Sequence, residues 1–180
     1  MRNYDCIFLD RDGTLNYDTG YIADLSKFNF YPFTIPALIH MSKKGNKFCI
    51  ITNQSGVDRG LIQIGKLDEI HEYIRHEFEK NEIVLLDIYV CPDHPNKASN
   101  RRKPGTGMFL EAAEQYNLSL NNCLMVGDSV DDMLVGMKLG METMLVLTGR
   151  GKKSLSKLGA NHKPTYVKKN ISEGFEQLCL

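Results

Sequence analysis

The sequence lacks a net charge, because its 22 Lys and Arg residues balance its 22 Asp and Glu residues. A balanced chain has no overall field that would attract nucleic acid or an anionic membrane, so we expect neither as a partner. The sequence also lacks any stretch near the roughly 20 consecutive apolar residues that a membrane-spanning helix needs. Residues 1–5 lack the apolar segment of a signal peptide, so we expect a cytoplasmic protein.

The sequence also lacks the even number of cysteines that is typical of a disulfide framework. The five cysteines are an odd number, and at least three of them fall in apolar runs, which indicates reduced thiols and not a disulfide framework. The 180 residues contain no internal repeat, linker or low-complexity tract, so we expect a single domain over residues 1–180. We expect this domain to act as a monomer or a weak homo-oligomer.

What is present is an alternation of apolar runs and helical patterns. Helices are predicted near residues 35–43, 64–78, 108–117 and 130–137. Strands separated by helices predict right-handed crossovers, and hence a parallel sheet with helices on both faces, a three-layer, Rossmann-like α/β fold. The predicted strands are five buried apolar runs: Cys6–Leu9, Phe48–Ile51, Leu85–Val90, Cys123–Val126 and Thr143–Leu147.

Other segments are expected to be loops or surface. Tyr17–Phe33 has no sustained period and predicts a loop reaching over the end of the first strand, and Cys91–Pro104 predicts a proline-containing loop. Gly149–Lys169 is basic, which predicts a solvated surface or a guide for an anionic substrate. One stripe at helical spacing is expected to lie in the core: Ile64, Leu67, Ile70, Ile74 and Phe78.

The chain is organised around Phe8–Asn16, where the first apolar run stops at Asp10 and Asp12. Open α/β sheets bind their ligands at such strand ends. One carboxylate can attack a phosphorus atom or hold a metal while the second moves a proton. An ordinary turn is the alternative interpretation of this stretch, since Asp and Gly are common turn residues.

Two more predicted strands end in polar residues, Thr52 and Asn53 after the second and Asp128 after the fourth. Since the carboxyl ends of parallel strands meet along one edge of a sheet, we expect these side chains to converge with Asp10. The loop residues Arg102 and Lys103 add two cations. Carboxylates, hydroxyl and amide donors, and cations together predict a magnesium-assisted phosphoryl site.

These motifs resemble those of the haloacid dehalogenase superfamily of phosphatases. More narrowly, they resemble its D,D-heptose 1,7-bisphosphate phosphatase and histidinol-phosphatase group. The matching stretches occur in the family's order and spacing over almost the whole chain: Asp10–Thr14, Thr52–Gly56, Lys103–Pro104 and Gly127–Asp132. The resemblance implies a compact fold with no large cap domain, in which loops close the site.

The resemblance also implies a role for each site residue. Asp10 would form an aspartyl-phosphate, and Asp12 would act as the general acid and base. Mg²⁺ would be held by the carboxylates of Asp10 and Asp128 and by the backbone carbonyl of Asp12. Asp131 and Asp132 would support the metal without holding it directly. Alternatively, the spacing of Ser129 and Asp132 predicts that Asp132 serves only in a helix capping box. Substrate and phosphate contacts would come from Asp18, Thr19, Gly20, Tyr21, Thr52, Asn53, Gln54, Ser55, Arg102 and Lys103.

Two positions depart from the family's pattern. Related enzymes commonly hold a structural zinc in the loop that begins at Cys91. Here Asp93, Ser99 and Arg101 stand at the other ligand positions. A closed zinc site needs about four N or S ligands, so we expect none. Ser129 stands where some heptose enzymes have a lysine that meets the substrate.

The expected function is Mg²⁺-dependent hydrolysis of a small phosphorylated sugar. The substrate implied by the resemblance is D-glycero-D-manno-heptose 1,7-bisphosphate, a lipopolysaccharide precursor of bacterial heptose biosynthesis, which would lose its 7-phosphate. Histidinol phosphate or another small sugar phosphate is the alternative substrate. A catalytically silent scaffold of the same fold is the alternative class of protein.

Overall fold

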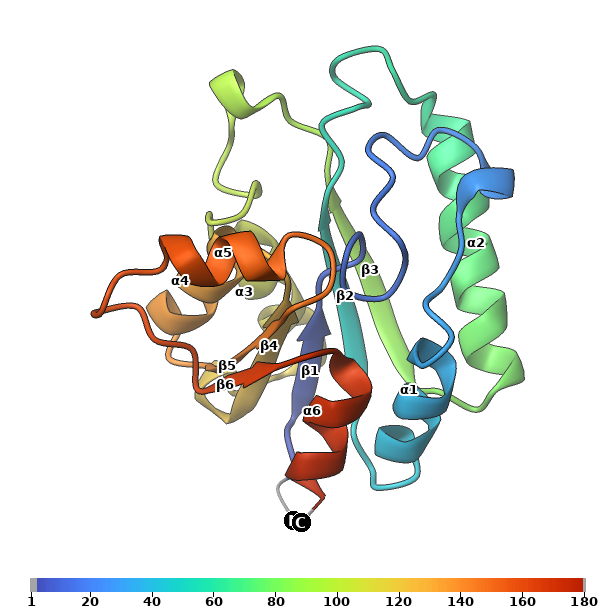
Figure 1. Cartoon of the computed structure of the whole chain (residues 1–180). Helices are drawn as coiled ribbons and strands as arrows, with labels where there is room; N and C mark the ends of the chain where they lie inside the picture. The colour runs from blue at the N-terminus through green and yellow to red at the C-terminus, as the bar shows by residue number, and fades with distance from the viewer. Residues whose placement is uncertain (1–2, 180) are drawn as a thin grey trace.

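The computed structural model describes residues 3–179, which contain a six-stranded sheet in the order β3-β2-β1-β4-β5-β6 (Figure 1). All five pairs of neighbouring strands are parallel. The predicted Rossmann-like α/β class is therefore confirmed. The strands are β1 Cys6–Leu9, β2 Phe48–Asn53, β3 Leu85–Cys91, β4 Cys123–Gly127, β5 Glu142–Val146 and β6 Tyr166–Lys168.

Helices cover both faces of this sheet (Figure 1). They are α1 Thr34–Ser42, α2 Ile64–Lys80, α3 Gly107–Tyr116, α4 Val130–Lys138, α5 Gly151–Lys157 and α6 Ile171–Leu178. Side chains alternate along β1, so Ile7 and Leu9 pack in one core cluster with α1, α2 and α6. Cys6 and Phe8 pack in the other cluster, with α3 and α4.

Five strands and four helices begin and end within a few residues of their predicted bounds. The C-terminal region differs from prediction, because the basic segment expected as surface contains α5 and β6, and α6 follows it. β6 has three residues at the edge of the sheet, which is too short for an apolar run to reveal it. Ile64 is also exposed and not in the core, because it is the first residue of α2 and precedes the packed part of the helix.

The segment Tyr17–Phe33 is largely a loop, as predicted, with one short 3-10 helix at Leu25–Lys27. Its apolar residues Ile22 and Phe28 are buried, and the Phe28 ring meets Tyr73 of α2 with 6.0 Å between ring centroids. The loop is thereby anchored to the body of the fold, while Tyr21 beside the strand ends is half exposed. No helix within residues 3–179 has the length and apolar character needed to cross a membrane.

Candidate active site

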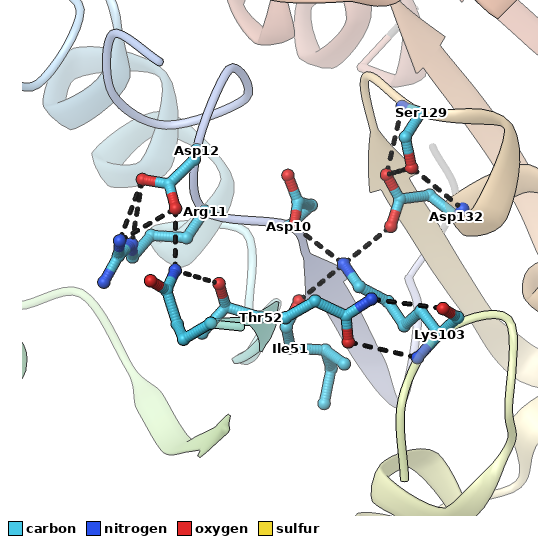
Figure 2. A network of polar contacts seen from close by, with 10 residues as sticks. Asp10, Arg11, Asp12, Ile51, Thr52, Lys103, Ser129 and Asp132 are labelled. Carbon is cyan, nitrogen blue, oxygen red and sulfur yellow. Dashed lines mark hydrogen bonds and ion pairs between the residues drawn. The ribbon is translucent and has the colours of Figure 1, made fainter. Parts of the chain in front are cut away.

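Lys103 is the centre of a buried polar network at the carboxyl ends of β1, β2 and β4 (Figure 2). Its Nζ donates to Asp10 Oδ1 at 2.7 Å, to the Ile51 carbonyl at 2.7 Å and to Asp132 Oδ1 at 2.6 Å. These contacts use all three donors of an ammonium group. Burial acts to lower the pKa of Lys103, but Asp10 and Asp132 outweigh it and raise that pKa above its usual value. Lys103 is therefore a fixed positive charge.

A reciprocal amide contact holds the backbone of Lys103 at the end of β2. Asn53 Nδ2 donates to the Lys103 carbonyl at 3.1 Å, and the Lys103 backbone N–H donates to Asn53 Oδ1 at 3.1 Å. The loop that carries Lys103 is thereby registered against the sheet. Asn53, which was predicted to contact the substrate, therefore holds the Lys103 backbone in place.

The carboxylates of Asp10 and Asp132 contact this ammonium, and the carboxylate of Asp128 lies close to both of them. Ligand oxygens of Asp10, Asp128 and Asp132 all lie within 4.8 Å of one another, and all three residues are buried. Burial raises the pKa of Asp10 well above its usual value, opposed by Lys103 and reinforced by Asp132 and Asp128. Burial, and then Asp132, raises the pKa of Asp128 to about 7. Such crowding of negative charge favours the binding of a further cation in addition to the Lys103 ammonium.

Asp132 is already occupied by contacts within the chain. Its Oδ1 accepts from Lys103, while its Oδ2 accepts from the hydroxyl of Ser129 at 2.6 Å and from the Ser129 N–H at 3.1 Å. Ser129 and Asp132 form the predicted capping box of α4. Of the two roles left open for Asp132, the structure shows the cap, and it adds the contact with Lys103.

Asp10 and Asp128 are left to face the cavity, and their surroundings fit Mg²⁺. The donors are carboxylate oxygens, which this hard cation prefers. Gly13 and Gly149 approach Asp128 so closely that a Cβ on either would overlap its Oδ2. Gly13 also has a φ of +86°, which disfavours other residues. Two glycines from distant segments thus cradle one potential ligand.

The Asp12 carboxylate lies on the far side of the site from Lys103 (Figure 2). Arg11 Nη2 donates to its two oxygens at 2.9 and 2.8 Å, and Asn16 Nδ2 donates at 2.9 Å. Burial acts to raise the pKa of Asp12, but Arg11, followed by Asn16 and Gln54, holds that pKa below its usual value. Asp12 is therefore an ionised carboxylate in this structure.

Gln54 links Asp12 to the end of β2. Its Nε2 donates to Asp12 Oδ2 at 2.7 Å and to Thr52 Oγ1 at 2.8 Å. Because Thr52 accepts from Gln54, its own hydroxyl proton is left to donate elsewhere, and Thr52 lines the cavity. Thr52 is thus suited to donate to a phosphoryl oxygen.

Arg11 and His71 were not expected in the site. Arg11 has no exposed surface, its guanidinium lies 5.9 Å from the centre of the Phe28 ring, and its Nη1 lies 3.2 Å from His71 Nε2. Burial, and then Arg11, lowers the pKa of His71 to about 3, so the ring is neutral and accepts from Arg11. The position of Arg11 between Asp10 and Asp12, directly after a buried strand, was the sequence signal that could have predicted its place in the site.

A cavity of about 390 Å³ joins these groups. The residues predicted to be catalytic, to bind substrate or phosphate, or to hold the metal all line it except Thr19, and their roles stay predictions. Arg59, Pro95, Ser129, Asp131 and Arg150 line it as well. Arg150 was not expected, since its segment was interpreted only as basic surface.

The loop from Cys91 has partners at the positions where related enzymes carry zinc ligands. Asp93 Oδ2 accepts from the Ser99 N–H at 2.8 Å, and the Asp93 carbonyl accepts from Arg102 Nη1 at 3.0 Å. The guanidinium of Arg101 donates to the Val90 carbonyl at 3.2 Å and pairs with Glu111. Hydrogen bonds within the chain therefore hold this loop, and the absence of zinc stays a prediction.

Comparison with known proteins agrees with this geometry. Residues 100–174 match the family model described as HAD-hyrolase-like. The chain is 36% identical over 174 residues to the D-glycero-beta-D-manno-heptose-1,7-bisphosphate 7-phosphatase of Pasteurella multocida, covering 93% of this chain and 92% of that relative. The protein of the same name from Escherichia coli K12 is 32% identical over 157 residues, or 83% of this chain and 82% of the relative.

A solved structure of D,D-heptose 1,7-bisphosphate phosphatase from B. bronchiseptica, complexed with magnesium and phosphate, superposes with a TM-score of 0.90. It is 30% identical and covers 99% of this chain and 98% of its own. The parallel sheet, the aspartates after β1 and the buried lysine beside them define a phosphatase of the haloacid dehalogenase class. Within that class, the chain belongs to the family of the D-glycero-D-manno-heptose-1,7-bisphosphate 7-phosphatases. The resemblance of the sequence motifs is confirmed.

Proposed function

We propose that the chain removes the 7-phosphate of D-glycero-D-manno-heptose 1,7-bisphosphate, with Asp10 as nucleophile and Asp12 as general acid and base. The observation that carries this proposal is the contact of Lys103 Nζ with Asp10 Oδ1 at 2.7 Å on a buried cavity wall. The names of the relatives supply the substrate. The names of the relatives from Pasteurella multocida and Escherichia coli specify the beta anomer.

The first half-reaction transfers the phosphoryl group to the chain. A carboxylate oxygen of Asp10 attacks phosphorus in line with the sugar oxygen, so a P–O bond to Asp10 forms as the P–O bond to the sugar breaks. Asp12 gives a proton to the departing sugar oxygen, which leaves as an alcohol. The Thr52 hydroxyl donates to another phosphoryl oxygen, and the positive charge of Lys103 beside Asp10 offsets the charge of the phosphoryl group.

The second half-reaction restores Asp10. Asp12 takes a proton from water as the water oxygen attacks phosphorus, and the P–O bond to Asp10 breaks to release inorganic phosphate. Mg²⁺ held by the carboxylates of Asp10 and Asp128 and by the Asp12 carbonyl would offset the repulsion between carboxylate and phosphate. Asp12 must gain its proton first, and a dianionic phosphate nearby raises the pKa of a carboxyl group.

The test measures phosphate release and kcat/KM for the beta and alpha heptose 1,7-bisphosphates and for histidinol phosphate, with Mg²⁺ present and then chelated. We expect the beta heptose bisphosphate to be preferred and the rate to depend on Mg²⁺. Asp10→Asn should release no phosphate, which would separate an enzyme from a silent scaffold. Equal, feeble turnover of all three substrates would contradict the heptose assignment.

A further inference from the structure

Arg11 and Asp12 are consecutive residues, and their side chains form a pair on the side of the site away from Lys103 (Figure 2). Arg11 Nε donates to Asp12 Oδ1 at 3.1 Å, and Arg11 Nη2 donates to the two carboxylate oxygens at 2.9 and 2.8 Å. A contact between chain neighbours moves with its own segment. It cannot by itself fix the Asp12 carboxylate relative to a substrate, so the pair needs anchors on other elements.

One anchor of the pair is Gln54, which directly follows β2. Its Nε2 donates to Asp12 Oδ2 at 2.7 Å and to Thr52 Oγ1 at 2.8 Å. Gln54 lines the catalytic cavity, so a bound phosphoryl group can compete with Asp12 for its amide hydrogens. Gln54 is therefore an anchor whose partners can change when a substrate binds.

The other anchor is His71, a buried residue of α2. Its Nε2 lies 3.2 Å from Arg11 Nη1 and accepts from it, while Nε and Nη2 of the same guanidinium hold Asp12. His71 does not line the catalytic cavity, and Arg11 has no exposed surface. A ligand in the cavity cannot reach this hydrogen bond, so the anchor stays in place when a substrate enters.

Helix α2 also supports the guanidinium indirectly, through the loop Tyr17–Phe33. The Phe28 ring of this loop lies 5.9 Å from the guanidinium carbon of Arg11, and it packs against Tyr73 of α2 with 6.0 Å between ring centroids. A planar guanidinium that meets both an aromatic ring and a hydrogen-bond acceptor has few orientations open to it. Because the guanidinium holds both oxygens of Asp12, its orientation sets the orientation of the carboxylate.

We propose that His71 is a positioning residue for the reaction, which acts through Arg11 to orient the Asp12 carboxylate toward the departing sugar oxygen. This inference rests on the proposed function, because it takes Asp12 as the general acid. A general acid contributes about 10²–10⁴ to a rate, and a misplacement of about 1 Å can cost about 10². Loss of the His71 hydrogen bond should therefore slow the release of a leaving group that needs a proton and spare one that needs none.

The test is the ratio of kcat/KM for the heptose 1,7-bisphosphate to kcat/KM for p-nitrophenyl phosphate. The sugar leaves with a proton, whereas p-nitrophenolate leaves as a stable anion. We expect His71→Asn, whose side chain is too short to reach Arg11, to lower this ratio at least about tenfold. His71→Gln, which places an oxygen near the position of Nε2, should keep most of the wild-type ratio. A partial loss of folding cancels from the ratio, because both rates come from the same folded molecules.

His76→Asn is the matched control, since His76 is an exposed residue of the same helix, and it should leave the ratio unchanged. His71→Met fills the space without a strong acceptor, and it replaces His71→Asn if that variant does not fold. A second measurement needs only the sugar substrate. In an Asp12→Asn background, His71→Asn should cause no further loss of kcat/KM, because the residue through which His71 acts has already been changed.

Three outcomes would overturn the inference. An unchanged ratio in His71→Asn, with or without an equal loss on both substrates, means that His71 supports only the fold. An equal fall of the ratio in His71→Gln and His71→Asn means that the hydrogen bond to Arg11 is not the cause. A further loss in the Asp12→Asn background means that His71 acts by another route. The wild-type rate on the sugar and the loss in Asp12→Asn alone test the proposed function separately, because neither measurement involves His71.

Discussion

His71 Nε2 lies 3.2 Å from Nη1 of the buried Arg11, and it accepts this hydrogen bond only while its ring is neutral. The other nitrogens of the same guanidinium hold Asp12. A helix residue with no place in the motifs thus supports the orientation of the proposed general acid. Arg11, which joins the two, is buried between Phe28 of the loop Tyr17–Phe33 and His71 of α2.

The neutral His71 should make stability depend on pH. Its pKa is lowered to about 3 in the folded chain, below the unfolded value near 6.5. Between these values the unfolded state binds more protons, so stability present above about pH 6.5 is lost as the pH falls toward 3. Urea unfolding at several pH values should show a smaller loss in His71→Gln than in wild type. His76→Gln, an exposed change on the same helix, should retain the wild-type dependence.

Removal of Lys103 should damage both activity and folding. Lys103→Met leaves Asp10 and Asp132 buried without their cation, which costs about 3–5 kcal/mol of unfolding free energy. We expect kcat to fall by a factor of at least about 10². The double variant Lys103→Met with Asp10→Asn should recover part of the stability and no activity. A stability equal to that of the single variant would show that the Asp10 charge is not the cause.

Mg²⁺ should stabilise the folded chain through Asp128. A ligand at 100 times its Kd adds about 2.7 kcal/mol to the unfolding free energy. Titrating MgCl₂ should therefore raise the Tm of wild type, and this rise should be lost in Asp128→Asn. Asp68→Asn, which removes an exposed carboxylate of α2, is the control and should keep the rise. A full rise in Asp128→Asn would exclude Asp128 as a ligand.

The cap of α4 should matter for catalysis as well as for stability. Ser129→Ala removes a hydroxyl that bonds Asp132, so we expect a loss of about 1 kcal/mol in unfolding free energy. A fall in kcat should accompany it, because Asp132 also holds Lys103. Asn170→Ala removes the cap of α6. Within residues 3–179, Asn170 makes no hydrogen bond or ion pair with Ser129, Asp132 or Lys103, so this variant should lower the unfolding free energy and leave kcat unchanged. An identical kcat in both variants would show that the hydrogen bond from Ser129 to Asp132 does not affect catalysis.

The strand ends could be predicted because each apolar run indicates a buried strand, and the polar residues that follow it indicate a functional site at its carboxyl end. Asp10, Thr52 and Asp128 converge for that reason. The orientation of Asp12 could not be predicted, since it depends on a fully buried Arg11, and charged residues are seldom buried. His71 belongs to a helix whose pattern indicates only core, and the edge strand β6 has no apolar run. The single domain over residues 1–180 stays a prediction.

The loop of residues 91–104 uses backbone and side-chain oxygens and nitrogens of the chain itself to hold Arg102 and Lys103 in place. Since we expect no zinc in this loop, we predict that strong chelators leave its geometry unchanged. Inactivation by a chelator is then expected to report on the catalytic ion alone, with full recovery on adding back magnesium and no refolding step.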